Sequence, residues 1–360
     1  MELTHDDVNA TRVTQWVRCC TVNSMPVEPF MSRNHPTYSP DPELLAHFPT
    51  VSGNAVNGLG ETETRRPSCF FWHPPERQTH GRLQRYVMSR FEKSRDGGKD
   101  WGDVGDRGPA PLPVAPERQE GTAQDWTNAV KAYALANEAD LVGVAEIDPL
   151  WVYESYQIAE PHVIMLGVGQ NYEKMKHAPP GPGNHHSNTE VRRQYNRGAR
   201  AASKLANFIH GLGYQATPHV GPMAGALNMI PAALAAGFGE LGKHGSIINR
   251  TLGSNLRLAG VSTDLPVIPD RPDLFGVDDF CTRCRVCTEA CPPDAIHDEK
   301  QTVRGAVKWY VDFDKCIPYF GERLGCALCM VVCPWSRPGV AENLIVKLAR
   351  RAAIGDATRA

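Results

Sequence analysis

The sequence predicts a protein of mixed α and β structure, in which an α/β or α+β core precedes a small cysteine-rich module. Three observations predict this class. Helical and strand-like hydrophobic patterns alternate from about residue 122, eight of the 11 cysteines gather between residues 281 and 333, and no segment repeats at solenoid periods. We therefore divide the 360 residues into an N-terminal arm (1–120), a core (121–276), a cysteine-rich module (277–340) and a C-terminal tail (341–360).

The N-terminal arm is rich in proline, glycine and charge, so we expect little regular structure in it. It nevertheless carries a run of apolar anchors, Phe70, Phe71 and Trp72. Such anchors favour an irregular arm that wraps the core over a disordered segment.

The core begins with a helical pattern over residues 125–136, followed by two apolar runs, 141–146 and 163–168, that are typical of buried strands. A further helix is predicted over 195–212. Tyr195 begins an apolar stripe on one face of that helix, and Ala199, Ala202, Ala206 and Ile209 continue it. By itself this pattern fits a core tyrosine whose hydroxyl binds a backbone group.

Three glycines, Gly237, Gly239 and Gly242, match the GxGxxG pattern of dinucleotide-binding proteins. That fingerprint requires a strand before it and a helix after it. Here an alanine-rich helical stretch precedes the glycines and an apolar strand-like run follows them. The glycines are therefore expected to end a helix and to let the backbone approach a bulky group closely.

The clustered cysteines form two runs, Cys281-x2-Cys284-x2-Cys287-x3-Cys291-Pro292 and Cys316-x9-Cys326-x2-Cys329-x3-Cys333-Pro334. The first run matches the bacterial ferredoxin pattern, in which the fourth cysteine ligates the other cluster of a pair. Structural zinc and disulfide bonds are poorer fits, since zinc has no use for paired Cys-x3-Cys-Pro endings. The runs predict a ferredoxin-like module with two [4Fe-4S] clusters, one on Cys281, Cys284, Cys287 and Cys333 and one on Cys291, Cys316, Cys326 and Cys329.

The remaining cysteines, Cys19, Cys20 and Cys69, are interpreted as plain reduced thiols. The formal net charge is −2, from 38 basic and 40 acidic residues, so we expect no strong positive potential that would attract nucleic acid. No apolar run is long enough to span a bilayer, and the N-terminus shows no signal core or twin-arginine leader. We expect a cytoplasmic protein, with an exported mature form as the alternative.

An ordered set of segments carries a family resemblance. It includes the strand at 163–168 running into Asn171-Tyr172-Glu173, the Tyr195 helix, the 236–243 glycine segment, Asn255-Leu256-Arg257, Thr263-Asp264-Leu265-Pro266 and both cysteine runs. Over residues 125–340 the chain resembles the corrinoid iron–sulfur reductive dehalogenases. The resemblance implies a nitroreductase-like core that binds base-off cobalamin beside the ferredoxin-like module.

The resemblance also implies roles for single residues. Tyr195 matches the family's proton donor, Arg257 the arginine that supports it, and Asn228 a third polar residue of the pocket. A tyrosine with an ordinary pKa of about 10 stays protonated at neutral pH, and a nearby guanidinium stabilises the tyrosinate left after proton donation. The expected cobalamin contacts are Tyr172, Lys243, His244, Leu252, Gly253, Ser254, Asn255 and Leu256.

The implied reaction is the reductive removal of halide from an aryl or alkyl organohalide. Electrons would come from an external ferredoxin, flavodoxin or reductase through the two clusters. Trp72, Tyr172 and Trp335 are candidates for an apolar substrate pocket. A membrane-anchor subunit and a second copy of the chain, as a homodimer, are further candidate partners.

Three alternatives share part of this machinery. The first is an epoxyqueuosine reductase acting on tRNA, although that family relies on an aspartate as its proton donor and needs a basic surface. The second is a corrinoid-free iron–sulfur electron carrier, for which a core of about 150 residues would be excessive. The third is a cofactor-binding maturation protein that retains the fold without catalysis.

Overall fold

The computed structural model describes residues 38–96 and 106–357, so Cys19 and Cys20 lie outside the described residues. The centre of the protein is a four-stranded sheet in the order β1-β2-β6-β3. Every neighbouring pair is antiparallel. The strands are β1 (Leu141–Glu146), β2 (His162–Gly169), β3 (Ala216–Val220) and β6 (Leu256–Thr263).

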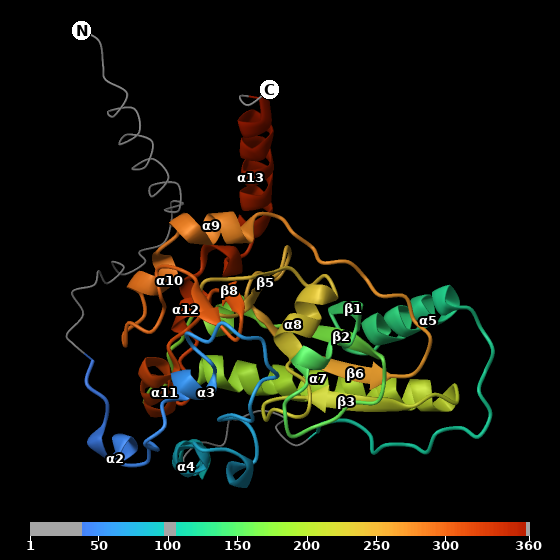
Figure 1. Ribbon diagram of the computed structural model, residues 1–360, viewed down its shortest axis with the longest axis horizontal. Coiled ribbons are helices and arrows are strands. Elements are labelled where there is room, and N and C mark those ends of the chain that lie inside the picture. The colour runs from blue at the N-terminus through green and yellow to red at the C-terminus, as the bar shows by residue number, and fades with distance from the viewer. Residues whose placement is uncertain (1–37, 97–105, 358–360) are drawn as a thin grey trace.

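Each face of the sheet packs against a different set of helices (Figure 1). One hydrophobic core joins the sheet to α5 (Ala123–Ala136) and α7 (His186–Gly211), and the other joins it to α8 (Met229–Ala235). Side chains along a strand point alternately to the two faces. On β6, Ala259 and Val261 accordingly enter the α7 core, while Leu256 and Leu258 contact the α8 core.

The predicted strands and helices of the core are confirmed, with shifts at their ends. β1 has the predicted bounds, and β2 extends the second run by one residue at each end. Helix α7 begins nine residues before the predicted start at Tyr195 and includes 26 residues. The sequence 186–194 is mostly polar, so it shows no apolar stripe, yet seven of these nine residues are buried or half-buried in the folded helix.

The glycine segment ends a helix, as expected. Helix α8 ends at Ala235, and Gly237 follows with a positive φ of 82°. The chain then forms the short hairpin β4 (Glu240–Leu241) and β5 (Ile247–Ile248). These glycines therefore do not form the strand–glycine–helix unit of a dinucleotide-binding site.

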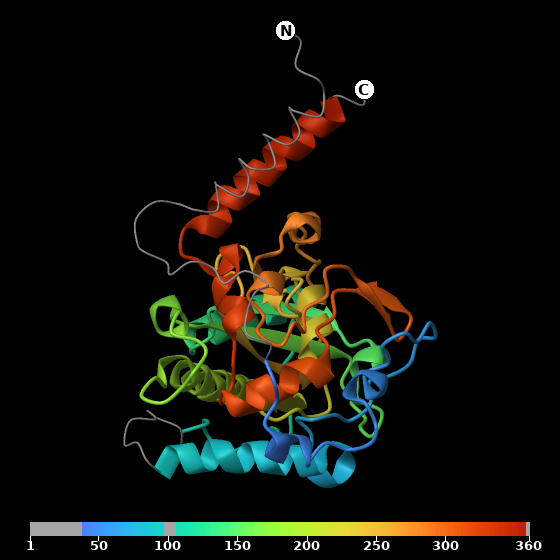
Figure 2. The ribbon, with the colours of Figure 1, turned by 90° about the vertical axis from the view of Figure 1, so that its left-hand side faces the viewer.

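The described part of the N-terminal arm contains more helix than expected. Helix α4 (Gly81–Asp96) was not expected from the sequence, and it runs along one side of the molecule (Figure 2). Phe71, Leu83 and Val87 form a fourth core with Ile317 of the cysteine-rich module. The arm thus packs on that module. The other elements before the core are α2 (Pro42–Leu45), α3 (Gly53–Val56) and η1 (Pro75–Arg77).

The cysteine-rich module consists of short elements, and a longer helix, α13, follows it. In Figure 2, α13 projects away from the rest of the protein. No helix in the described ranges has the length and apolar character needed to cross a bilayer. The remaining elements are η2 (Pro149–Trp151), α6 (Tyr172–Met175), α9 (Val277–Arg283), α10 (Val286–Glu289), β7 (Gln301–Val303), β8 (Ala306–Lys308), α11 (Phe313–Glu322), α12 (Leu328–Val332), η3 (Pro334–Ser336) and α13 (Val340–Ala357).

Candidate functional site

Tyr195 and Arg257 meet between α7 and the sheet. Arg257 lies two residues before Ala259 on β6, so the alternation of the strand points it to the α7 side. Its guanidinium carbon is 5.5 Å from the centroid of the Tyr195 ring. The Nη1 atom donates to the Leu256 carbonyl at 3.0 Å, while the buried Nε has no hydrogen-bond partner in the described structure. A cation therefore faces an aromatic ring, and one of its donors is available to a ligand.

The backbone at Gly221 also lies close to the Tyr195 ring. A Cβ atom added at Gly221 would lie 2.3 Å from Cε1 of Tyr195, so only glycine fits there. The Gly221 carbonyl in turn accepts a hydrogen bond of 2.6 Å from Arg107. Burial lowers the pKa of that arginine. The position of the ring is thus determined by segments far apart in the sequence.

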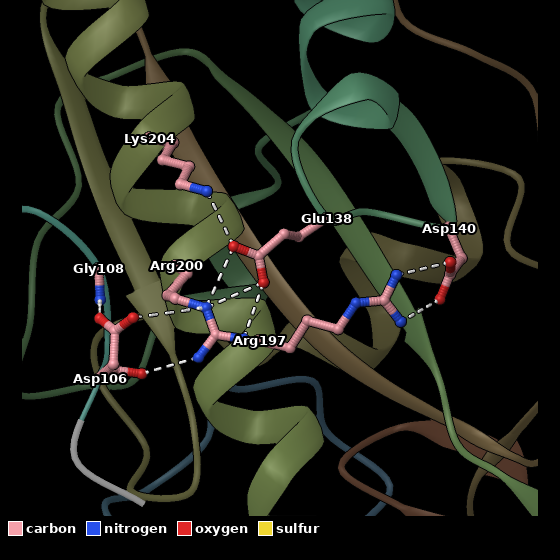
Figure 3. Close-up of polar contacts among 7 residues, drawn as sticks. All are labelled: Asp106, Gly108, Glu138, Asp140, Arg197, Arg200 and Lys204. Atoms are coloured by element: carbon pink, nitrogen blue, oxygen red, sulfur yellow. Dashed lines mark hydrogen bonds and ion pairs between the residues drawn. The ribbon is translucent and has the colours of Figure 1, made fainter. Parts of the chain in front are cut away.

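Ion pairs on α7 fix the helix next to Tyr195 (Figure 3). Arg197 forms two bonds of 2.7 Å to Asp140, and Asp140 also accepts the Gly169 N–H at the end of β2. Arg200 and Lys204 both bind Glu138, at 2.8 and 2.9 Å. Although partial burial opposes it, these two cations hold the pKa of Glu138 below its ordinary value. The pairs thus join α7 to Glu138 and Asp140, which directly precede β1.

Asn228, the third predicted pocket residue, precedes α8. Its backbone N–H donates to the Trp151 carbonyl at 2.8 Å, and its side chain makes no capping bond. In the described part of the chain, no hydrogen bond or ring contact joins its side chain to Tyr195 or Arg257. The structure thus brings together two of the three predicted catalytic residues and does not link the third to them.

A group of buried polar atoms without partners surrounds the first half of α7. Asn188 is 5% exposed, and neither its Nδ2 nor its Oδ1 has a partner in the described structure. It lies seven residues before Tyr195 and so shares its helix face. Buried polar groups are normally hydrogen-bonded, so such a group indicates a missing polar ligand. Gln170 Oε1, Ser187 Oγ and Gln194 Oε1 also have no hydrogen-bond partner in the described structure.

These α7 residues carry no motif, and their only signal in the sequence is that they lie within eight residues before Tyr195. Glu190 illustrates how they are held: its Oε1 accepts bonds from the Asn171 N–H at 2.8 Å and from Gln194 at 2.9 Å. Tyr172, a predicted cofactor contact, begins α6 directly after Asn171 and is half-buried. The loop after β2 and the start of α7 therefore line the same region.

The predicted cobalamin contacts between 243 and 256 lie where the core meets the cysteine-rich module. His244 accepts the Ser246 N–H at Nδ1 and lies 2.9 Å from Ser254 Oγ at Nε2. Because a neutral imidazole carries one proton, Nε2 is the donor to Ser254. Burial lowers the pKa of His244 to about 4, which keeps it neutral. The Ser254 hydroxyl proton is then free to bind a further acceptor.

The same segment binds the module directly. Asn255 donates to the Ser336 carbonyl at 2.5 Å, and the Ser254 N–H donates to Ser336 Oγ at 3.2 Å. Gly253 has a φ of 56°, and a Cβ added there would lie 2.0 Å from the Trp335 carbonyl. Trp335 itself is 1% exposed and packs edge-on against Phe275 and Phe280. Trp335 is therefore a core residue of the junction.

Glu240, which the sequence did not single out, anchors the first cysteine helix. Its Oε1 accepts the N–H groups of Phe275 at 2.6 Å and Val277 at 3.0 Å, and its Oε2 accepts that of Asp278 at 3.4 Å. The N–H groups of Val277 and Asp278 belong to the first turn of α9 and have no partner within the helix. The carboxylate of β4 thereby holds α9, with Cys281, against the core.

The eight cysteines fall into two groups in space. Electrostatic interactions connect Cys333 to Cys281, Cys284 and Cys287. A second set connects Cys329 and Cys316 to Cys291 and Cys326, and Cys329 also interacts with Cys287 of the first group. The two groups are therefore neighbours.

Burial raises the pKa of seven of these eight thiols, to about 12 for Cys281, Cys287 and Cys316. Such thiols need a metal to hold them as thiolates. Within residues 38–96 and 106–357, no three Cys, His, Asp or Glu side chains converge on a single ion. Zinc requires such convergence, whereas the ligands of a four-iron cluster bind separate iron atoms.

Comparisons with known proteins agree with this arrangement. Residues 280–336 match the 4Fe-4S dicluster domain family, so the module is a two-cluster iron–sulfur domain. The chain is similar to the tetrachloroethene reductive dehalogenase of Sulfurospirillum multivorans, with 29% identity in an alignment 278 positions long that covers 63% of this chain and 54% of that protein. The chain thus spans about half the length of this relative.

A solved catabolic reductive dehalogenase, in complex with 3-bromo-4-hydroxybenzoic acid, has the same fold. It superposes with a TM-score of 0.65 and 24% identity over 93% of this chain and 49% of that one. The chain is also similar over a shorter region to an epoxyqueuosine reductase of Leadbetterella byssophila. The two share 34% identity in an alignment 121 positions long, which covers 29% of this chain and 35% of that protein. The chain is thus related to the reductive dehalogenases and, over a smaller part, to the epoxyqueuosine reductases.

Proposed function

We propose that this chain is a reductive dehalogenase that removes halide from an organohalide with the help of cobalamin and two [4Fe-4S] clusters. The observation that carries the proposal is the Tyr195–Arg257 contact, which lies in a fold shared with a reductive dehalogenase and close to unpartnered buried polar groups. The similarity to the tetrachloroethene enzyme supports the reaction class.

The residues around α7 fit a corrinoid. This cofactor carries amide side chains around its ring, and the unpartnered amide atoms of Asn188 and the Oε1 of Gln194 can bind such groups. The Ser254 hydroxyl and the backbone at 252–256 would hold it from the junction side, with Tyr172, Lys243 and His244 nearby. When bound, cobalamin supplies the low-valent cobalt centre at which the carbon–halogen bond is broken.

Tyr195 is the proposed proton donor. Its hydroxyl gives a proton to the carbon that has lost halide, and the Arg257 guanidinium attracts the negative charge left on the ring. We retain Asn228 only as a candidate for orienting substrate. Gly221 packs closely against the Tyr195 ring, which restricts the movement of the ring during this step.

The cysteines are proposed to ligate in the two spatial groups. Cys281, Cys284, Cys287 and Cys333 would hold one cluster, and Cys291, Cys316, Cys326 and Cys329 the other; the electrostatic grouping supports this partition. The clusters, when bound, supply single electrons that come from an external ferredoxin, flavodoxin or reductase.

The test is to prepare the chain without oxygen, with cobalamin and reconstituted clusters, and to measure iron, cobalt and halide release. We expect about eight iron atoms, as two four-iron clusters require, and about one cobalt per chain. Halide release from an aryl or alkyl halide would support the proposal. Iron without cobalt would leave an electron carrier, and cobalt without halide release, but with turnover of epoxyqueuosine in tRNA, would favour the other related family.

A further inference from the structure

Lys243 is a buried cation next to the first cysteine group. Its side chain is 2% exposed, in the loop between β4 and β5. No carboxylate in the described residues lies within ion-pair distance of its ammonium, which instead lies 4.9 Å from the centroid of the Trp309 ring. An uncompensated buried charge is costly, so the fold must supply a negative partner for it.

The first cysteine group lies beside this cation. The Trp309 ring that the ammonium contacts packs in one hydrophobic core with Cys281 and Cys333, and the ammonium attracts the sulfurs of Cys281 and Cys287. The loop that carries Lys243 is fixed through its neighbour His244, which binds Ser246 and Ser254. The cation therefore has a defined place beside one cluster, and the second cysteine group shows no such interaction with it.

Net charge and hydrogen bonds to sulfur are among the factors that set the reduction potential of an iron–sulfur cluster. A cluster with four thiolate ligands is anionic and gains a further negative charge on reduction. A nearby cation stabilises the reduced form more than the oxidised form, and low polarity around the pair strengthens the effect.

We propose that the positive charge of Lys243 raises the reduction potential of one cluster and leaves that of the other unchanged. The affected cluster is the one on Cys281, Cys284, Cys287 and Cys333. This inference rests on the proposed ligand partition but not on cobalamin binding or dehalogenation. The Lys243 side chain then serves the iron–sulfur domain, although the residue lies in sequence between β3 and β6 of the core sheet.

Lys300 offers a matched control. Its ammonium lies 5.5 Å from the centroid of the same Trp309 ring, so it shares the aromatic contact. Unlike Lys243, it is paired with a carboxylate, Asp278, at 2.6 Å, and its side chain is 31% exposed. Its charge is therefore compensated and screened by solvent, and its removal should have little effect on the cluster.

The experiment is a redox titration, followed by electron paramagnetic resonance, of the full chain with reconstituted clusters and without cobalamin or substrate. In Lys243→Met, we expect the potential of one cluster to shift downward while that of the other stays at its wild-type value. Lys243→Arg retains the charge and should stay near wild type, and Lys300→Met should change neither cluster.

Unchanged potentials in Lys243→Met, or an equal shift of both clusters, would overturn the proposal. If a variant fails to assemble a cluster, the number of iron atoms per chain still tests the proposal. Loss of about four iron atoms in Lys243→Met but not in Lys243→Arg would support a role for the charge. The same loss in both variants would show that only the shape of the side chain matters, which contradicts the proposal.

Discussion

The Arg257 guanidinium faces the ring of Tyr195, with 5.5 Å between its central carbon and the ring centroid. The contact arises because α7 packs on the side of β6 that carries Arg257. At this distance the guanidinium can attract charge on the ring and also orient it. The pair thus has the geometry that the proposed proton donation requires, and other buried polar atoms on α7 have no hydrogen-bond partner in the described structure.

Removing the Tyr195 hydroxyl should stop the reaction without disturbing the fold. We expect Tyr195→Phe to lower halide release about 10²-fold or more, as loss of a general acid typically does. Iron and cobalt per chain should be unchanged, because the ring still packs against Gly221. Arg257→Met should lower the rate as well, and Arg257→Lys should lower it less. Loss of cobalamin from Tyr195→Phe would instead show that the tyrosine is structural.

The cysteine partition can be tested by alanine substitution. Cys281→Ala and Cys333→Ala should each lower iron from about eight to about four atoms per chain, and both should remove the same electron paramagnetic resonance signal. Cys316→Ala should remove the other signal. The partition would be wrong if Cys333→Ala removed the signal that Cys316→Ala removes.

Glu240 should contribute strongly to the junction between core and module. Glu240→Gln replaces a charged acceptor of three backbone N–H groups, and we expect a loss of about 2 kcal/mol in unfolding free energy. Chemical denaturation would measure it. Glu289→Gln, at a surface pair with Arg285, is the control and should change stability by less than about 0.5 kcal/mol. Equal effects of the two substitutions would contradict the anchoring role.

Glu138 should stabilise the position of α7. We expect Glu138→Gln to lower the free energy of unfolding by about 1 kcal/mol at neutral pH. Partly exposed ion pairs, such as those of Glu138 with Arg200 and Lys204, contribute little more than this. Because its pKa in the folded protein is lowered, the contribution exists above the ordinary pKa and is lost as pH falls below it. Denaturation at pH 7 and at pH 4 should show the difference between variant and wild type shrinking at the lower pH.

His219 should make the fold less stable in mild acid. Burial lowers its pKa to about 4, so between pH 6.5 and 4 the unfolded chain binds a proton that the folded chain does not. Stability should fall with pH in this window, by about 1.4 kcal/mol per unit from this residue. His219→Asn keeps an amide within reach of Ser262 and should show a smaller drop in melting temperature from pH 7 to pH 5. An identical drop in both proteins would contradict this assignment.

Local patterns in the sequence determined much of the fold. The apolar run at 141–146 predicted β1 with its bounds, and the glycines after Ala236 were correctly interpreted as a helix end. The spacing of the cysteines predicted a two-cluster module, which the match over 280–336 confirms. These features depend on neighbours in the chain, so the sequence contains their physical cause.

Tertiary packing decided the rest. The order β1-β2-β6-β3 places Arg257 opposite Tyr195, and no local pattern contains that pairing. Lys243 follows a glycine segment of the core, but its burial against Trp309 and Cys281 arises only when the module docks there. Helix α4 was missed because its stability comes from apolar contacts with α11, distant in sequence, more than from its own composition. These charged and aromatic side chains are distant in sequence, so only the packing of the elements that carry them brings them into contact.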